Sequence, residues 1–502
     1  MKLIKKNIIM IILIFQPILD IFAFFSMNTK LSIIPFIIRA AILLISSYII
    51  FIRNINNKKY ILSIGIIFIY CLLHLINTYF TTNLSLVEDI KELVRIFYMP
   101  ILLINGYMYS KEDSNMFEQL KKGVIINTLI VFLVIILGLI TNTSIPTYAE
   151  GIGLRGWFYN SNSQSLILCI TVPLFLFYCF KNKNIFVKII STIISFFLLY
   201  TNGTTGCYIM LFPTFIIPFI YVITSKNSNK IKTLEIFMLS GAIFLSIAIY
   251  KYSPEYKIDN MQNSSFTDVK EQFKDVIDNN ENNNDLNKGE QDKNNNSTEQ
   301  NKEENNNNTE QNKEENLLSM DNIDKNSKLD KSKKELIYYY FDKNFIKDYG
   351  YDIIYKSLED NFDLNHLVNN RFRKKTVAKI IFNESKISTK ILGIEFTKIN
   401  QYGYDMESDY SSILYYCGYL GFTIYLSLII YIIFRLFITF ICKPKLMLNA
   451  EFLVLSSVFC IANLGAELSG SLLRRPNASI YLCVLAIMIL IKYGEKHEKK
   501  RN

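Results

Sequence analysis

The sequence predicts an all-α polytopic membrane protein with about twelve transmembrane helices and one large extracytoplasmic loop between the ninth and the tenth helix. Half of the residues are apolar (50%), and Ile, Leu, Phe and Tyr are gathered in continuous runs. Runs of about 17 to 25 apolar residues are long enough to cross a bilayer as helices. This clustering excludes an ordinary soluble globular domain. One polar stretch, residues 251–409, interrupts the runs.

Twelve helices are expected, nine before the polar stretch and three after it. The first nine cover residues 8–25, 31–52, 60–80, 93–109, 124–141, 164–180, 185–200, 204–224 and 234–250, and the last three cover 410–441, 451–465 and 479–493. No small-residue cleavage site follows the first run, so we interpret it as a retained helix and not as a signal peptide. Arg95 and Pro100 shorten the fourth run, which we expect to tilt or to lie partly at the membrane interface.

The positions of lysine and arginine predict the topology. Basic loops at residues 53–59, 111–122, 181–183, 226–232 and 443–445 alternate with segments that are poor in Lys and Arg. Basic loops stay on the cytoplasmic side, so we expect both termini in the cytoplasm and the polar stretch outside the cell membrane. The chain then divides into a membrane domain at 1–250, an extracytoplasmic loop at 251–409, and a second membrane domain with a cytoplasmic tail at 410–502.

The extracytoplasmic loop has two parts of different composition. Residues 278–316 are rich in Asn, Glu, Lys and Gln and contain a near-perfect repeat, which begins at Thr298 and again at Thr309. So little apolar surface cannot offset the entropy of ordering, and we expect a disordered insertion. Residues 334–400 regain Tyr, Phe, Ile and Leu at roughly helical spacing. We expect that part to fold as short helices, near 336–345 and 370–382, on the outer membrane face.

Cysteine and histidine usage excludes two kinds of site. All eight cysteines lie in or beside apolar runs, so no disulfide framework is implied. The three histidines are scattered over a helix, the polar stretch and the tail, so we expect neither a metal nor a cofactor. The formal charge of +10 resides mostly in short loops and therefore indicates topology, not nucleic-acid binding.

The loop at residues 151–162 is the first candidate binding segment. It holds Arg155, the single Trp of the chain, and the amides of Asn160 and Asn162 just before a helix. The asparagines could cap that helix, and Trp157 with Tyr159 could anchor the interface. Alternatively, the arginine and the amides bind an anionic or sugar substrate at the helix N-terminus.

A basic cluster in the polar stretch is the second candidate. Arg371 and Arg373 stand beside Lys374 and Lys375. We interpret the two lysines as a solvated face. A guanidinium that points into a cleft above the membrane would suit a diphosphate, because it binds phosphate oxygens in a bidentate way.

Acidic residues before the tenth helix are the third candidate. Glu407 and Asp409 precede the helix and are favoured there by its dipole whatever their function. A carboxylate at a membrane-facing cleft could also remove a proton from a sugar hydroxyl, with Glu407 the first choice and Asp409 the second.

Five further charged residues are also candidates for a functional site. Asp20 and Arg39 lie inside apolar runs, where ionisable groups are expensive and indicate either function or mutual pairing. Glu467, Arg474 and Arg475 fall in the last outer loop, and the two arginines could extend a basic rim around a lipid phosphate.

Several segments together resemble a known family. They are Arg155-Gly-Trp-Phe-Tyr-Asn-Ser-Asn162 before a helix, Thr201-Asn-Gly-Thr-Thr-Gly206 at the start of another, Ile391-Leu-Gly-Ile-Glu-Phe396 late in the large loop, and Glu407-Ser-Asp-Tyr410 ahead of Gly418-Tyr-Leu-Gly421. With the helix count and the large outer loop, this pattern resembles the O-antigen ligase and O-antigen polymerase superfamily of polytopic glycosyltransferases. Glu407 stands where ligases of the family often carry His.

The resemblance implies glycosyl transfer on the outer side of the membrane, without a metal. The donor would be an undecaprenyl-diphosphate-linked glycan, and the acceptor a glycan or another molecule. The resemblance also implies that arginines stabilise the departing lipid diphosphate. We assign Arg155, Arg371 and Arg373 to the diphosphate, Asn160 and Asn162 to sugar, and Glu407 or Asp409 to the base. We favour a polymerase over a ligase. A flippase for the same lipid-linked sugars is the alternative, although no repeat between the halves of the chain supports a transporter.

Overall fold

The structure is a computed structural model that describes residues 7–82, 85–225, 229–261, 323, 327–359, 369–445, 449–470 and 472–494. The Asn-rich insertion expected at 278–316 lies outside these residues. Within them the secondary structure is helical, with a single isolated β-bridge between Ile145 and Gly156. The predicted all-α class is confirmed.

Twelve long helices form the membrane part of the described chain. They are α2 (Ile8–Phe25), α3 (Ile34–Arg53), α4 (Lys58–Thr81), α5 (Leu86–Glu112), α6 (Met116–Ile140), α7 (Ser161–Phe180), α8 (Ile185–Asn202), α9 (Thr205–Thr224), α10 (Asn229–Ala248), α21 (Asp409–Cys442), α22 (Ala450–Leu468) and α23 (Pro476–Tyr493). Eleven of them are long and apolar enough to cross a membrane. The protein is therefore a multi-pass membrane protein, as its apolar runs predict.

Helix α5 is the one long helix of the described chain that is not among the eleven. It runs for 27 residues through Pro100, so it is longer than the short span expected from the sequence. Its first turns carry Asp89 and Glu92, and both carboxylates are buried, at 2% exposure each. Buried ionisable groups need partners. Asp89 contacts His74 on the preceding helix and the distant Phe396 backbone N–H, and Glu92 contacts Arg95 on α5 and the distant Arg474.

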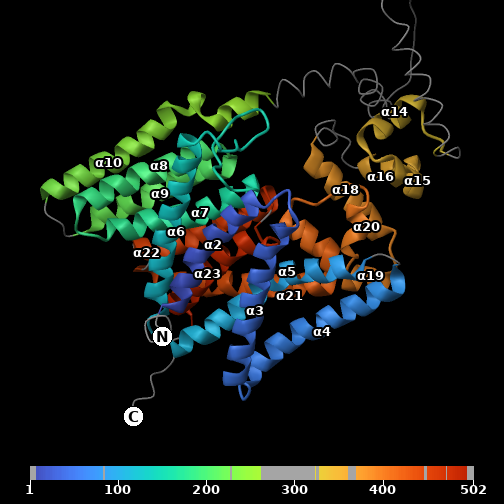
Figure 1. The fold of residues 1–502 in the computed structure, drawn as a ribbon, viewed down its shortest axis with the longest axis horizontal. Coiled ribbons are helices and arrows are strands. Elements are labelled where there is room, and N and C mark those ends of the chain that lie inside the picture. The colour runs from blue at the N-terminus through green and yellow to red at the C-terminus, as the bar shows by residue number, and fades with distance from the viewer. Residues whose placement is uncertain are drawn as a thin grey trace, which may run out of the picture. The chain divides into compact units, whose positions relative to one another are not determined.

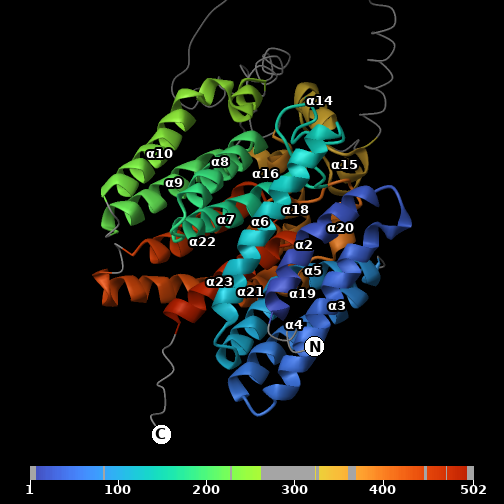
Figure 2. The same ribbon diagram turned by 60° about the vertical axis from the view of Figure 1, so that its left-hand side comes forward.

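The twelve helices belong to one compact unit, formed by residues 1–260, 387–396 and 407–502. Helix α7 is its centre, because every side chain from Ser163 to Phe180 is buried. Helices α8, α9 and α10 lie side by side in both views (Figures 1 and 2). By contrast, α4 and α10 expose many large apolar side chains, as expected of helices that contact lipid.

A second unit comprises residues 261–386 and 397–406. Its helices are α14 (Lys331–Tyr340), α15 (Lys343–Tyr349), α16 (Tyr351–Glu359) and α18 (Asn370–Asn383), and α20 (Phe396–Asn400) begins on the last residue of the first unit. The expected helix at 336–345 is divided in two, because Asp342 caps α15 and accepts a hydrogen bond from the Asn344 backbone N–H at 2.9 Å. The helix expected at 370–382 is α18.

The short segment 387–396 belongs to the first unit, although the chain continues into the second unit at both of its ends. It contains α19 (Ile387–Leu392), which packs on α4 and α21. Helix α21 is broken opposite this segment, at Gly418, whose φ is 62°. A Cβ atom on Gly418 would lie 2.5 Å from the backbone of Gly393. The glycines allow the two backbones to touch.

Candidate functional site

A polar pocket of about 400 Å³ opens among the ends of several helices of the first unit. Helices α2, α3, α5, α7 and α23 each contribute to its wall, together with the short 3₁₀ helix η1 (Lys30–Ile33). Its polar and charged lining residues are Asp20, Ser32, Arg39, Arg95, Tyr159, Asn160, Ser163, Gln164, Arg475 and Asn477. We call this space the arginine pocket.

A buried ion pair forms one side of the arginine pocket. Arg39 on α3 contacts Asp20 on α2 at 2.7 Å, and only 5% and 7% of the two residues are exposed. The Arg39 Nε–H also donates to the side-chain oxygen of Gln16 at 3.0 Å, and Asn477 hydrogen-bonds to the Asp20 carboxylate. The sequence left open whether Asp20 and Arg39 pair or act, and the structure shows that they pair while lining the pocket.

A second carboxylate holds two further arginines. One oxygen of Glu92 on α5 lies 2.7 Å from both the Nε and a terminal nitrogen of Arg474, and the other lies 3.2 Å from Arg95. Arg474 is buried and is not among the lining residues, whereas Arg95 and Arg475 line the arginine pocket. Glu92 thus holds Arg95 by an ion pair, which favours a preorganised anion site.

The charge of this region is positive. Two carboxylates, of Asp20 and Glu92, face four guanidinium groups, of Arg39, Arg95, Arg474 and Arg475, which leaves a net formal charge of +2. Gln164 adds a fully buried amide at the wall, and neither its oxygen nor its nitrogen has a hydrogen-bond partner in the structure. An anion with several oxygen atoms suits such a site. The described residues contain no cluster of His, Cys, Asp and Glu that could hold a metal ion.

An apolar cavity of about 250 Å³ is lined by α2, α3, α5, α6 and α23, and it shares no lining residue with the arginine pocket. On α3 the pocket ends at Arg39 and the cavity begins at Ile42, and on α23 the step is from Asn477 to Ile480. Three helical residues rise by about 4.5 Å. On these two helices a basic space and an apolar space are therefore close neighbours, an arrangement that suits a ligand with an anionic head and an apolar tail.

A comparison with protein families identifies the chain. The profile described as "O-antigen ligase like membrane protein" matches residues 2–496, which is nearly the whole sequence. The chain belongs to this family. Neither the curated proteins nor the solved structures contain a match to it. The family membership confirms the resemblance drawn from the motifs.

In this O-antigen ligase-like protein, one of the three binding residues predicted in and beside the loop before α7 lines the arginine pocket. Asn160 lines it and also caps α7, because its side-chain oxygen accepts from the Ser163 backbone N–H at 2.8 Å. Asn162 donates to the Ser469 carbonyl at 3.3 Å and so joins the loop to the segment before α23. Arg155 is not among the lining residues. Burial lowers its pKa, since the charged guanidinium loses hydration.

The acidic residues before α21 are placed differently from each other. One oxygen of Asp409 accepts from the backbone N–H groups of Leu472 and Leu473, at 2.7 and 2.8 Å, and the residue is 1% exposed. It therefore holds the loop that carries Arg474. Glu407 is partly exposed, and its carbonyl is packed against Gly470. The structure does not test whether either carboxylate acts as a base.

The predicted arginines of the large loop lie in the second unit. Arg371 is exposed near the start of α18, and the Arg373 guanidinium donates to the Tyr340 carbonyl at 3.1 Å and lies 5.2 Å from the Tyr340 ring centre. Arg373 thus helps to hold α14 beside α18 within that unit. The contribution of both to a substrate site stays a prediction.

Several lining or supporting residues of the O-antigen ligase-like protein were not selected as site residues from the sequence, among them Glu92, Arg95, Gln164 and Asn477. A signal existed for Arg95, because an arginine within an apolar run is costly and its i−3 neighbour is Glu92. We attributed it to the topology of the fourth helix instead. Gln164 and Asn477 carry no signal in the sequence that separates them from ordinary helix-end residues.

Proposed function

We propose that the protein is a membrane glycosyltransferase that acts on undecaprenyl-diphosphate-linked glycans at the outer side of the cell membrane, with both termini in the cytoplasm. The observation that carries the proposal is the basic arginine pocket with an apolar cavity near it on α3 and α23. Family membership supports glycan transfer, and the paired spaces support a lipid-linked donor. Polymerisation of repeat units is the reaction we favour.

The diphosphate of the donor would bind to Arg39, Arg95 and Arg475 in the arginine pocket. Guanidinium groups held in place before the reaction stabilise charge that develops on the leaving diphosphate. The first isoprene units would enter the apolar cavity. The glycan would leave past Asn160 and the exposed Tyr159, which are polar or amphipathic residues at the rim.

The reaction exchanges one bond to the anomeric carbon for another. The acceptor hydroxyl attacks that carbon, the bond to the diphosphate oxygen breaks, and the lipid diphosphate stays bound to the arginines. The hydroxyl proton passes to a carboxylate. We propose Glu407 for this role, because the two backbone hydrogen bonds of Asp409 occupy one of its oxygens. Asp20 is the carboxylate that lines the pocket and is the second choice.

The length distribution of lipid-linked glycans tests the proposal. Cells would carry the native protein, Arg475→Ala, Glu407→Gln or Asp20→Asn at equal expression, with Arg53→Ala on an exposed part of α3 as the matched control. Single repeat units that accumulate outside in Arg475→Ala, but not in the control, support a polymerase. Long lipid-linked chains that accumulate instead indicate a ligase. Units that accumulate inside the cell indicate the flippase alternative, and an unchanged distribution contradicts a role of the arginine pocket.

A further inference from the structure

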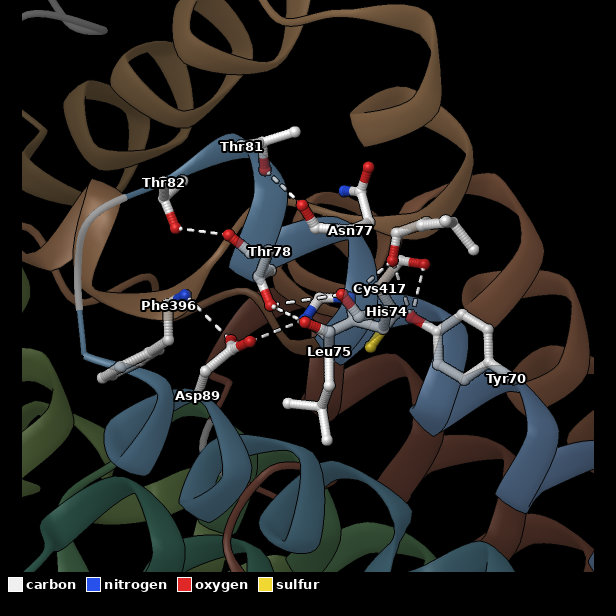
Figure 3. A network of polar contacts seen from close by, with 11 residues as sticks. Tyr70, His74, Leu75, Asn77, Thr78, Thr81, Thr82, Asp89, Phe396 and Cys417 are labelled. Carbon is white, nitrogen blue, oxygen red and sulfur yellow. Dashed lines mark hydrogen bonds and ion pairs between the residues drawn. The ribbon is translucent and has the colours of Figure 1, made fainter.

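A buried histidine joins two helices to the short segment 387–396. His74 on α4 is 1% exposed, and its two ring nitrogens each contact an oxygen (Figure 3). The Nδ1 atom lies 2.6 Å from the Leu392 carbonyl oxygen, and the Nε2 atom lies 3.0 Å from one carboxylate oxygen of Asp89. The other Asp89 oxygen accepts from the Phe396 backbone N–H at 3.2 Å. The histidine and the aspartate together hold both ends of a short stretch of backbone.

The partners of His74 determine how many protons the pair carries. A carbonyl oxygen only accepts, so Nδ1 must carry a hydrogen. Between Nε2 and the Asp89 oxygen one further proton is needed, either on the ring or on the carboxyl group. Without it, a lone pair would face a carboxylate in a buried place, which is costly. The pair therefore holds one shared proton in this arrangement.

Tyr70, one turn before His74, extends the contact to α21. Its hydroxyl lies 2.9 Å from the Leu392 carbonyl and 2.7 Å from the Cys417 carbonyl. The Cys417 carbonyl is available because α21 breaks at Gly418. The Ile394 backbone N–H donates to the Tyr415 carbonyl at 2.9 Å across the same break. With the Phe396 N–H, five backbone groups of the segment and of α21 are thus held by side chains of α4 and α5 or by one another.

The held segment is linked by contacts to residues that support the arginine pocket. The Phe396 ring lies 5.2 Å from the Tyr416 ring, and the Arg474 guanidinium lies 4.8 Å from the centre of that same ring. Arg474 in turn binds Glu92, which follows Asp89 by one helical turn on α5. The contacts therefore run from His74 through Phe396 and Tyr416 to the carboxylate that orients Arg95.

We propose that His74 and Asp89 are positioning residues of the transferase: by sharing one proton they fix segment 392–396 against the break in α21, and through it the Glu92 and Arg474 support of the arginine pocket. The proposal rests on the proposed function only for its effect on glycan transfer. The fixing of the segment is a property of the fold that can be measured by itself.

One substitution separates the shared proton from the shape of the side chain. In Asp89→Asn the amide oxygen can accept from the Phe396 N–H, and the amide nitrogen can donate to an unprotonated Nε2. All three hydrogen bonds are kept, and the extra proton is no longer required. Asp89→Ala and His74→Ala remove the bonds, and Glu88→Gln, next to Asp89 but partly exposed, is the matched control.

Hydrogen exchange of the purified full chain in lipid nanodiscs is the decisive measurement, with glycan length in cells as the second readout. In peptides that cover 387–396, Asp89→Asn should keep its protection within about twofold of the native protein. His74→Ala and Asp89→Ala should lose about tenfold in protection and in product. An Asp89→Asn variant as exposed as Asp89→Ala would overturn the proposal, as would a His74→Ala variant with native protection. If the two alanine variants lose protection as expected but the glycan length stays native, the proposed function is contradicted and the role of His74 and Asp89 in holding the segment is not.

Discussion

Arg39 and Arg53 lie on the same helix, α3, and each binds a carboxylate, yet the two pairs differ in burial. The Arg39 pair with Asp20 is nearly inaccessible, whereas the Arg53 side chain is 52% exposed beside Glu112. Loss of one partner from a buried pair costs about 3–5 kcal/mol, and an exposed pair contributes about 0–1 kcal/mol. We expect Arg39→Ala to lower the thermal stability of the detergent-solubilised protein strongly and Arg53→Ala to leave it nearly unchanged. Equal melting temperatures would show that Arg39 can be replaced by water in the pocket.

Also at the residue scale, the roles of Asp409 and Glu407 can be distinguished by whether a substitution lowers the unfolding temperature or abolishes glycan transfer. Hydrogen bonds to a charged group are worth about 1.5–3 kcal/mol each, and Asp409 accepts two from the backbone of the Leu472 loop. Asp409→Ala is expected to lower the unfolding temperature and to loosen that loop. Glu407→Gln should keep the native unfolding temperature while it abolishes glycan transfer. Measurement of both quantities on both variants checks the assignment, and a stable, inactive Asp409→Ala would reverse it.

At the scale of elements, the broken helix α21 depends on two glycines that touch. Gly418 has a φ of 62°, and a Cβ atom there would lie 2.5 Å from the Gly393 nitrogen. Gly418 also has a ψ of −175°, a conformation almost exclusive to glycine, and another residue there costs about 1–3 kcal/mol before any clash. Gly418→Ala should therefore destabilise the protein and raise hydrogen exchange in segment 387–396. Gly65→Ala on α4 is the control, because nothing lies within 4 Å of its added carbon, and it should stabilise by up to about 1 kcal/mol. If Gly418→Ala changed neither the stability nor the hydrogen exchange of segment 387–396, the break in α21 would not depend on this glycine.

The helices themselves could be predicted because their signal is local. A continuous apolar run of bilayer length needs no partner to be recognised, and α2 has the bounds that its run predicts. The arginine pocket could not be predicted in the same way. Glu92 and Arg474 are 382 residues apart in the sequence, and His74 and Leu392 are 318 apart. Only packing brings such groups together, and a single sequence carries no record of it.

At the scale of the whole molecule, the topology follows from the basic loops and remains a prediction. Labelling with an impermeant maleimide tests it in a chain whose eight native cysteines are replaced. Tyr339→Cys, on an exposed position of the second unit, should react in intact cells. Ile55→Cys, exposed between α3 and α4, should react only after the cells are opened. The reverse pattern would place the arginine pocket on the cytoplasmic side and would remove an extracytoplasmic donor from consideration.

The long separation between the partners of the His74 clamp also has a consequence for biogenesis. Helices α4 and α5 leave the ribosome about 300 residues before Leu392 and Cys417 do. During that interval Tyr70, His74 and Asp89 sit in newly inserted helices without the backbone groups that satisfy them in the finished protein. Buried polar groups without partners are costly, so the half-made chain must be held by the insertion machinery or reach water at the lipid boundary. A ribosome that stalls within the polar stretch would therefore leave a product with the features that membrane quality control removes.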